Sequence, residues 1–172
     1  MVSDRAKALI KLALDGMNCP SIPDLFHASN ELVKLFGLAF NRKLASLHEK
    51  VSKAIAVLAL MNRMNKDISI IQTQQDILDA LHKEEAMFVS GIDRYRSVIH
   101  MLSTLVYPFN ISNGNIQTSS SVHNGLMELV DMAKVLRDEY SINDNHYRII
   151  KFSNQIADIA SLIDAWWLWV NR

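Results

Sequence analysis

Nine of eleven positions spaced three or four residues apart between Ile71 and Val106 are apolar, over five consecutive heptads. A repeat of 3.5 residues sustained over this length indicates a long helix that packs lengthwise on another helix, as in a coiled coil. The alternation of period two that marks a strand does not occur here. The sequence therefore predicts a helix over residues 69–106, with a stripe formed by Ile71, Gln74, Leu78, Leu81, Glu85, Phe88, Ile92, Tyr95, Ile99, Leu102 and Val106.

A second stripe with the same spacing precedes it and predicts a helix over residues 24–64. Only a short polar turn centred near Asn65 separates the two helices, so they should pack antiparallel as a hairpin. In that register Leu81 should lie near Val51. The stripe of the earlier helix comprises Leu25, Ser29, Leu32 or Val33, Phe36, Phe40, Leu44, Leu47, Val51, Ala54, Leu58 and Met61.

Shorter amphipathic patterns fill the rest of the chain. They predict helices over residues 4–16, 121–140 and 145–170, and a long polar loop over 108–120 that begins at Pro108. Pro108 should end the preceding helix because its ring disfavours helical backbone before it.

The fold class that follows is all-α, with five helices in a single domain over residues 1–172. We expect the long antiparallel hairpin to be completed into a bundle by the two C-terminal helices. The hairpin is longer than the other helices, so its tip near Asn65 should overhang. An overhanging apolar seam would require a protein partner or a second copy of the chain.

Composition narrows the function classes. The chain of 172 residues has 18 basic and 18 acidic side chains, and a net charge of zero argues against a general nucleic-acid binder. Cys19 is the only cysteine, which suits a reducing compartment. The first residues lead into an amphipathic pattern and not into a signal peptide, and no apolar run could span a membrane. We therefore expect a cytoplasmic or intracellular protein.

Charge is unevenly distributed along the hairpin. Residues 34–66 carry seven basic side chains and one acidic one, whereas residues 67–106 carry six acidic and three basic ones. The simplest interpretation is that the two helices pair along their edges, and we expect Glu85 to pair with Lys50, Lys43 or His48. The alternative is that a basic stripe contacts phosphate or an acidic partner. That stripe comprises Arg42, Lys43, Lys50 and Lys53.

Catalytic signatures are lacking in the sequence. No glycine-rich phosphate loop, Gly-x-Ser-x-Gly or Cys-x-x-Cys motif occurs. The hairpin register would bring His48 and His82 together, with Glu49 and Glu85 nearby, and imidazoles and carboxylates are ligand types for zinc or iron. No His-Glu-x-x-His motif supports such a site. We therefore predict no catalytic residue, no cofactor and no metal ligand.

The C-terminal run Trp166-Trp167-Leu168-Trp169 is the sharpest local feature. On a helical wheel Trp166 and Trp167 fall on the apolar side, so Trp167 should be buried in the core. Leu168 and Trp169 fall on the polar side and are predicted to form a docking or dimer contact. Binding to an anionic membrane surface would need flanking basic residues, and only Arg172 is near.

These patterns together predict a non-enzymatic helical module for protein–protein interaction or assembly, which self-associates. The alternative function is a nucleic-acid-associated structural or regulatory protein that uses the basic stripe. A helical metal-binding protein or enzyme is the third. Salt-dependent retention on a nucleic-acid column would favour the second function, and metal in the purified protein would favour the third.

Overall fold

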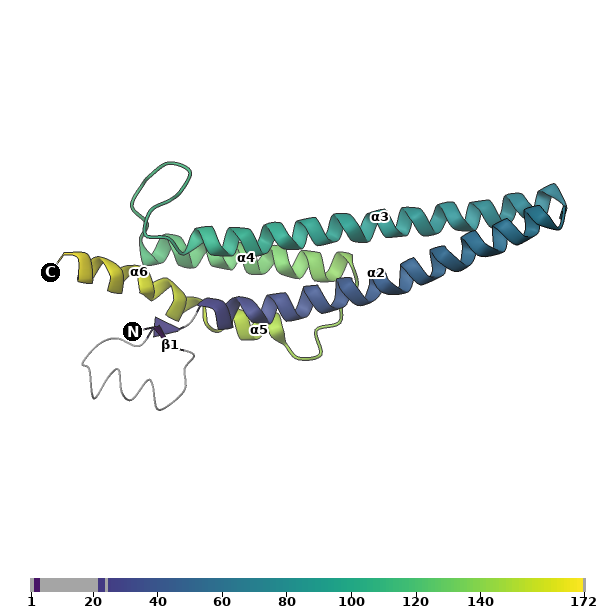
Figure 1. Cartoon of the computed structure of the whole chain (residues 1–172). Helices are drawn as coiled ribbons and strands as arrows, with labels where there is room; N and C mark the ends of the chain where they lie inside the picture. Colours follow the sequence, from purple (N-terminus) through teal and green to yellow (C-terminus); the bar gives the residue numbers. More distant parts are fainter. Residues whose placement is uncertain (1, 4–21, 24, 172) are drawn as a thin grey trace. The chain divides into compact units, whose positions relative to one another are not determined.

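The computed structural model describes residues 2–3, 22–23 and 25–171. The protein is all-α, as the sequence predicts (Figure 1). Two strands of two residues each, β1 (Val2–Ser3) and β2 (Ile22–Pro23), form a parallel pair, and β2 lies against α6. The helices are α2 (Leu25–Arg63), α3 (Ile68–Leu105), α4 (Ser119–Glu139), α5 (Arg148–Ser153) and α6 (Ile156–Val170).

The described residues form two compact units, and each is described by itself. Unit 2 is Gly37–Arg94, which contains most of α2 and α3. Unit 1 contains the described residues up to Phe36 and those from Tyr95 onward. The single domain expected over residues 1–172 stays a prediction.

Unit 2 is a hairpin in which α2 and α3 run side by side up to a tight turn (Figure 1). Asn65 adopts a left-handed conformation, with φ of 47°, and ends α2. The Lys66 NH donates to Met61 O at 3.2 Å and the Asn65 NH to Asn62 O at 3.3 Å. This is the Schellman arrangement, with Asn in place of the more common Gly.

Asp67 then caps α3. Its carboxylate accepts hydrogen bonds from the Ser69 backbone NH at 2.9 Å and from the Ser69 hydroxyl at 3.0 Å. These bonds, the backbone one first, hold the pKa of Asp67 below its ordinary value because they favour the charged carboxylate. The turn is therefore fixed from both sides, by Asn65 and by Asp67.

Cross-helix contacts in unit 2 agree with the register predicted about Asn65. The Gln74 side-chain amide donates to Ala54 O at 3.5 Å, and the rings of Phe40 and Phe88 meet edge to face with centroids 6.2 Å apart. The large side chains that are fully or almost fully buried in this unit are few, because a two-helix hairpin encloses only one seam. They are Phe40, Leu47, Leu78 and Phe88, with the small Ala54 among them.

The core of unit 1 lies around α4, which packs against α5 and α6. Gly125 lets α4 approach the end of α3 closely, since a Cβ there would lie 2.7 Å from a Leu105 methyl. Arg148 at the start of α5 forms a 3.0 Å ion pair with Glu31 of α2. The buried face of α4 recurs at helical spacing and comprises Val122, Leu126, Leu129, Val130, Ala133 and Leu136.

Two predictions about helix boundaries in this unit are wrong. The fourth helix begins at Ser119 and not at 121, because Thr118 and not Ser121 is its N-cap. Thr118 Oγ1 accepts from the Ser121 NH while the Ser121 hydroxyl accepts from the Thr118 NH, a reciprocal capping box. The polar loop therefore ends two residues earlier than the predicted 108–120.

The helix predicted over 145–170 is two helices, α5 and α6. The first of them, α5, begins at Arg148 and not at 145, because the Asp144 carboxylate caps the NH groups of Arg148 and Ile149. Tyr147 just before it is left-handed, with φ of 51°. The predicted helix breaks after Ser153 because the Gln155 NH bonds Phe152 O, three residues back, instead of four. The helix predicted over 4–16 lies outside the described residues.

No helix within the described part of the chain is long and apolar enough to cross a membrane.

Candidate functional site

The basic stripe on α2 is partly neutralised within unit 2. Lys43 pairs with Glu84 of α3 at 3.1 Å, and its ammonium lies 5.3 Å from the Phe88 ring centroid. Lys53 pairs with Glu49 at 2.6 Å on the same helix, and this hydrogen bond lowers the pKa of Glu49. Two of the four stripe cations, Arg42 and Lys50, remain, and neither has an ion pair with any residue that the structure describes.

The prediction for Glu85 is confirmed. His48 Nε2 lies 2.7 Å from Glu85 Oε1, an ion pair when the imidazole is protonated. His82, the proposed second imidazole, is exposed and makes no hydrogen bond within the described residues. Across that part of the chain no group of three His, Cys, Asp or Glu side chains could hold a metal ion.

The two cross-helix pairs mark the two flanks of the hairpin. Because residues seven apart return to the same side of a helix, the flank that carries Lys43–Glu84 can be followed toward the turn. We call this side the ion-pair flank. Its residues are Lys43, Lys50, Val57 and Met64 on α2 and Glu84, Ile77 and Ile70 on α3.

The half of the ion-pair flank nearest the turn is apolar and open. Val57, Met64, Ile70 and Ile77 are between 40% and 58% exposed. A two-helix unit offers no third layer that could cover these side chains. The sequence predicted an exposed apolar surface near the tip of the hairpin. The structure shows on which flank of the hairpin these apolar side chains lie.

The C-terminal tryptophans pack on the loop between α3 and α4. The Phe109 ring meets Trp166 and Trp167 edge to face, with centroids 6.0 and 5.3 Å apart. Trp167 is half-buried, so the prediction that it lies in the core is wrong: it covers the loop at the end of unit 1. Leu168 is exposed, as expected, whereas the side chain of Trp169 lies outside the described residues.

Gln117 holds that loop together and was missed by sequence reasoning. Its side-chain amide donates to Leu105 O at 3.3 Å and to Tyr107 O at 3.0 Å, which satisfies carbonyls at the end of α3. The backbone carbonyl of Gln117 accepts a hydrogen bond from Trp167 Nε1 at 3.1 Å. The residue is 7% exposed. A glutamine one residue before a helix cap carries no sequence signal for this role.

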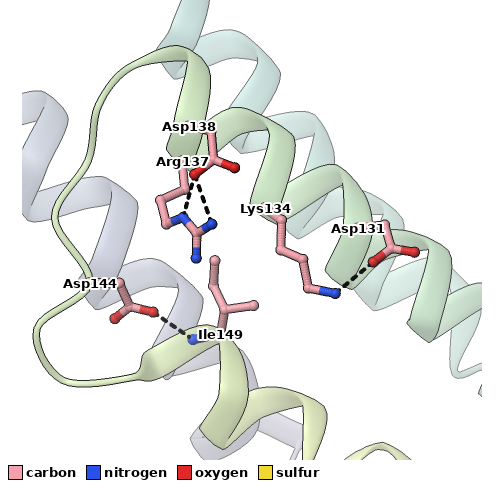
Figure 2. A network of polar contacts seen from close by, with 6 residues as sticks. All are labelled: Asp131, Lys134, Arg137, Asp138, Asp144 and Ile149. Carbon is pink, nitrogen blue, oxygen red and sulfur yellow. Dashed lines mark hydrogen bonds and ion pairs between the residues drawn. The ribbon is translucent and has the colours of Figure 1, made fainter.

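A pocket of about 530 Å³ lies between α4 and α5. Figure 2 shows that the charged groups around it already have partners, so none is left to hold an anion. The contacts are Lys134 with Asp131 (2.8 Å), Arg137 with Asp138 (2.7 Å), and Asp144 with the NH groups of Arg148 (2.8 Å) and Ile149 (3.1 Å).

A second groove, of about 410 Å³ between α4 and α6, contains residue types used in nucleophilic catalysis. Ser119, His123 and Asp164 line it. His123 makes no hydrogen bond with any described residue, and the Ser161 hydroxyl donates to the backbone carbonyl of Asp158. A nucleophile needs a base within hydrogen-bond reach and a group that orients that base. No such set of hydrogen-bonded groups occurs among the described residues that line this groove.

Comparison with known proteins assigns no family and no function to the chain. The chain matches no protein-family model, no curated protein and no solved structure.

Proposed function

We propose that the protein is a non-enzymatic helical assembly module that self-associates through the ion-pair flank of unit 2. The observation that carries this proposal is the row of half-exposed apolar side chains along one flank of a two-helix hairpin. Val57, Met64, Ile70 and Ile77 form that row. Large apolar patches on a protein surface mark contact sites more often than chance exposure does.

A second copy suits this flank because the flank is self-complementary. In a two-fold dimer the same patch faces itself, so apolar residues of one copy meet apolar residues of the other. Two hairpins packed by their flanks form a four-helix arrangement, which supplies the cover that a single hairpin lacks. Burying the exposed half of a Val, Ile or Met side chain contributes about 0.7–1.5 kcal/mol.

Charge contributes little on the apolar half of this flank. Lys43 and Glu84 at its far end already pair with each other at 3.1 Å, and Lys50 has no ion pair with any described residue. Asp76 and Asp79 of α3 accept hydrogen bonds from the glutamines one turn before them, and helical spacing places them on the back of α3 and toward its other flank. The contact therefore depends on the apolar row.

Sedimentation velocity tests the proposal. The double variant Val57→Glu/Ile77→Glu places two charges on the ion-pair flank. The matched control Ile55→Glu/Val89→Glu places two charges on other exposed positions of the same hairpin, which are 49% and 47% exposed. We expect a wild-type dimer that the flank variant converts to a monomer and the control leaves intact, with equal helix content by circular dichroism.

Two outcomes contradict the proposal. One is a wild-type chain that stays monomeric up to the highest concentration at which it remains in solution. The other is equal dissociation of the flank variant and the control. Because the contact is apolar, the dimer should persist as salt rises, since ionic strength screens charges and not apolar contacts.

A further inference from the structure

Two stretches of unit 1 contain no charged residue. No Asp, Glu, Lys or Arg occurs over residues 97–127 or over 165–171. The two stretches meet where Phe109 packs on Trp166 and Trp167, and where Trp167 Nε1 bonds the carbonyl of Gln117. We call this region the uncharged end.

The uncharged end exposes large apolar side chains. Ile111 and Ile116 on the loop are 64% and 66% exposed, and Leu168 beside the tryptophans is 68% exposed. Tyr107, Phe109 and Val170 are also exposed. Apolar side chains that are exposed together on stretches without charged residues gain free energy when they move from water into an apolar environment.

The loop is built so that its backbone tolerates partial dehydration. The Asn110 NH donates to Asn115 O, the Gly114 NH to Asn110 O and the Gln117 NH to Pro108 O, each at 2.8 Å. The Ser112 and Asn115 NH groups bond the side chains of Asn110 and Asn113. Backbone donors that are satisfied internally cost little when water is withdrawn, whereas unsatisfied ones cost several kcal/mol.

We propose that the uncharged end inserts into the interface of a zwitterionic lipid bilayer. Isoleucine side chains would enter the boundary between headgroups and acyl chains. The rings of Trp and Tyr would lie at the headgroup level, where such rings are enriched because they have an apolar body and a polar tip. The amides and hydroxyls of the loop would remain hydrated among the headgroups.

The absence of charge from both stretches selects among membrane surfaces. Attraction to anionic lipids needs clusters of Lys and Arg next to the inserted groups. The sequence contains none over 97–127 or over 165–171. Binding should therefore depend on apolar contact and be nearly independent of phosphatidylserine content and of salt.

Co-sedimentation of the full chain with phosphatidylcholine vesicles tests this inference. The three tryptophans of the sequence, at positions 166, 167 and 169, all lie in the last turns of α6, so intrinsic fluorescence reports directly on this end. We expect the wild-type chain to sediment with vesicles and its emission to shift to shorter wavelength. Neither result should change in about 0.5 M NaCl, at which ionic interactions are largely screened.

Matched variants locate the contact. Ile111→Asn/Ile116→Asn should lower vesicle partitioning at least about tenfold, because each isoleucine contributes a burial term of order one tenfold step. Val135→Asn/Ile150→Asn changes two side chains on α4 and α5 that are 58% and 56% exposed, and it should bind like the wild type. Val57→Glu/Ile77→Glu should also still bind, since this inference does not depend on self-association.

Four results would overturn the inference. The first is no sedimentation of the wild-type chain with phosphatidylcholine vesicles. The second is equal loss in the two asparagine variants. The third is binding only when phosphatidylserine is present. The fourth is a loop variant that leaves vesicle binding unchanged but dissociates a dimer in the ultracentrifuge, which would assign the uncharged end to a second copy of the chain.

Discussion

Replacing Gln117 by Ala removes one side chain that fixes the loop between α3 and α4. The amide donates to Leu105 O and Tyr107 O and is almost fully buried. Each lost hydrogen bond costs about 0.5–1.5 kcal/mol net, and a carbonyl left dry adds about 1 kcal/mol or more. The total is about 2–4 kcal/mol. For a chain of this length, that corresponds to a fall in Tm of about 4–16 °C.

Differential scanning calorimetry measures that fall, and Gln117→Glu is the informative control. A carboxylate has the same shape but cannot donate to carbonyls, so the glutamate variant should be at least as unstable as the alanine variant at neutral pH. Protonation at low pH restores one donor, so part of the loss relative to wild type should return on acidification. A Gln117→Ala Tm within about 1 °C of wild type would refute the role given to this side chain.

Three further outcomes follow from unit 2. Leu47→Ala should cost about 2–5 kcal/mol in chemical denaturation, because Leu47 is fully buried. Asp67→Ala should lower Tm at neutral pH. The fold lowers the pKa of Asp67, so the stability that the carboxylate adds is fully present above its unfolded pKa. That stability is lost as pH falls through the folded pKa, and the difference in Tm between the variant and the wild type should therefore vanish in acid. Glu85→Leu should leave Tm unchanged or raise it in thermal melts. An apolar side chain there replaces a half-buried carboxylate, and its partner His48 can turn to water. A large fall in Tm would mean that Glu85 has another role.

The sequence was sufficient to predict the hairpin. The repeat from Ile71 to Val106 reports which side of α3 faces α2, and the short turn leaves one antiparallel register. That register placed Glu85 near His48, one of the three partners predicted for it, and the two side chains lie 2.7 Å apart. Heptad spacing is a local property of the chain, so it can be followed without knowledge of the rest of the fold.

The helix boundaries and the exposed flank could not be predicted from the apolar spacing alone. Helix starts at Ser119 and Arg148 depend on which of several Ser, Thr and Asp side chains turns back to cap the backbone. The break at Gln155 changes a single hydrogen bond and leaves the apolar spacing intact. A seam pattern also gives no information on how many other helices cover the sides of a hairpin, so the exposure of Ile77 is a tertiary property.

The central claim is that the ion-pair flank contacts a second copy, and site-specific photo-crosslinking tests it most directly. Leu60 lies one turn from Val57 and Met64 on the same side of α2 and is exposed, whereas Ile55 lies on the side of His48. A benzophenone side chain at Leu60 should give a covalent dimer on illumination, with the crosslink mapping to residues of the ion-pair flank. The same group at Ile55 should give none. A chain that crosslinks from Ile55 and not from Leu60, or from neither, would contradict the account.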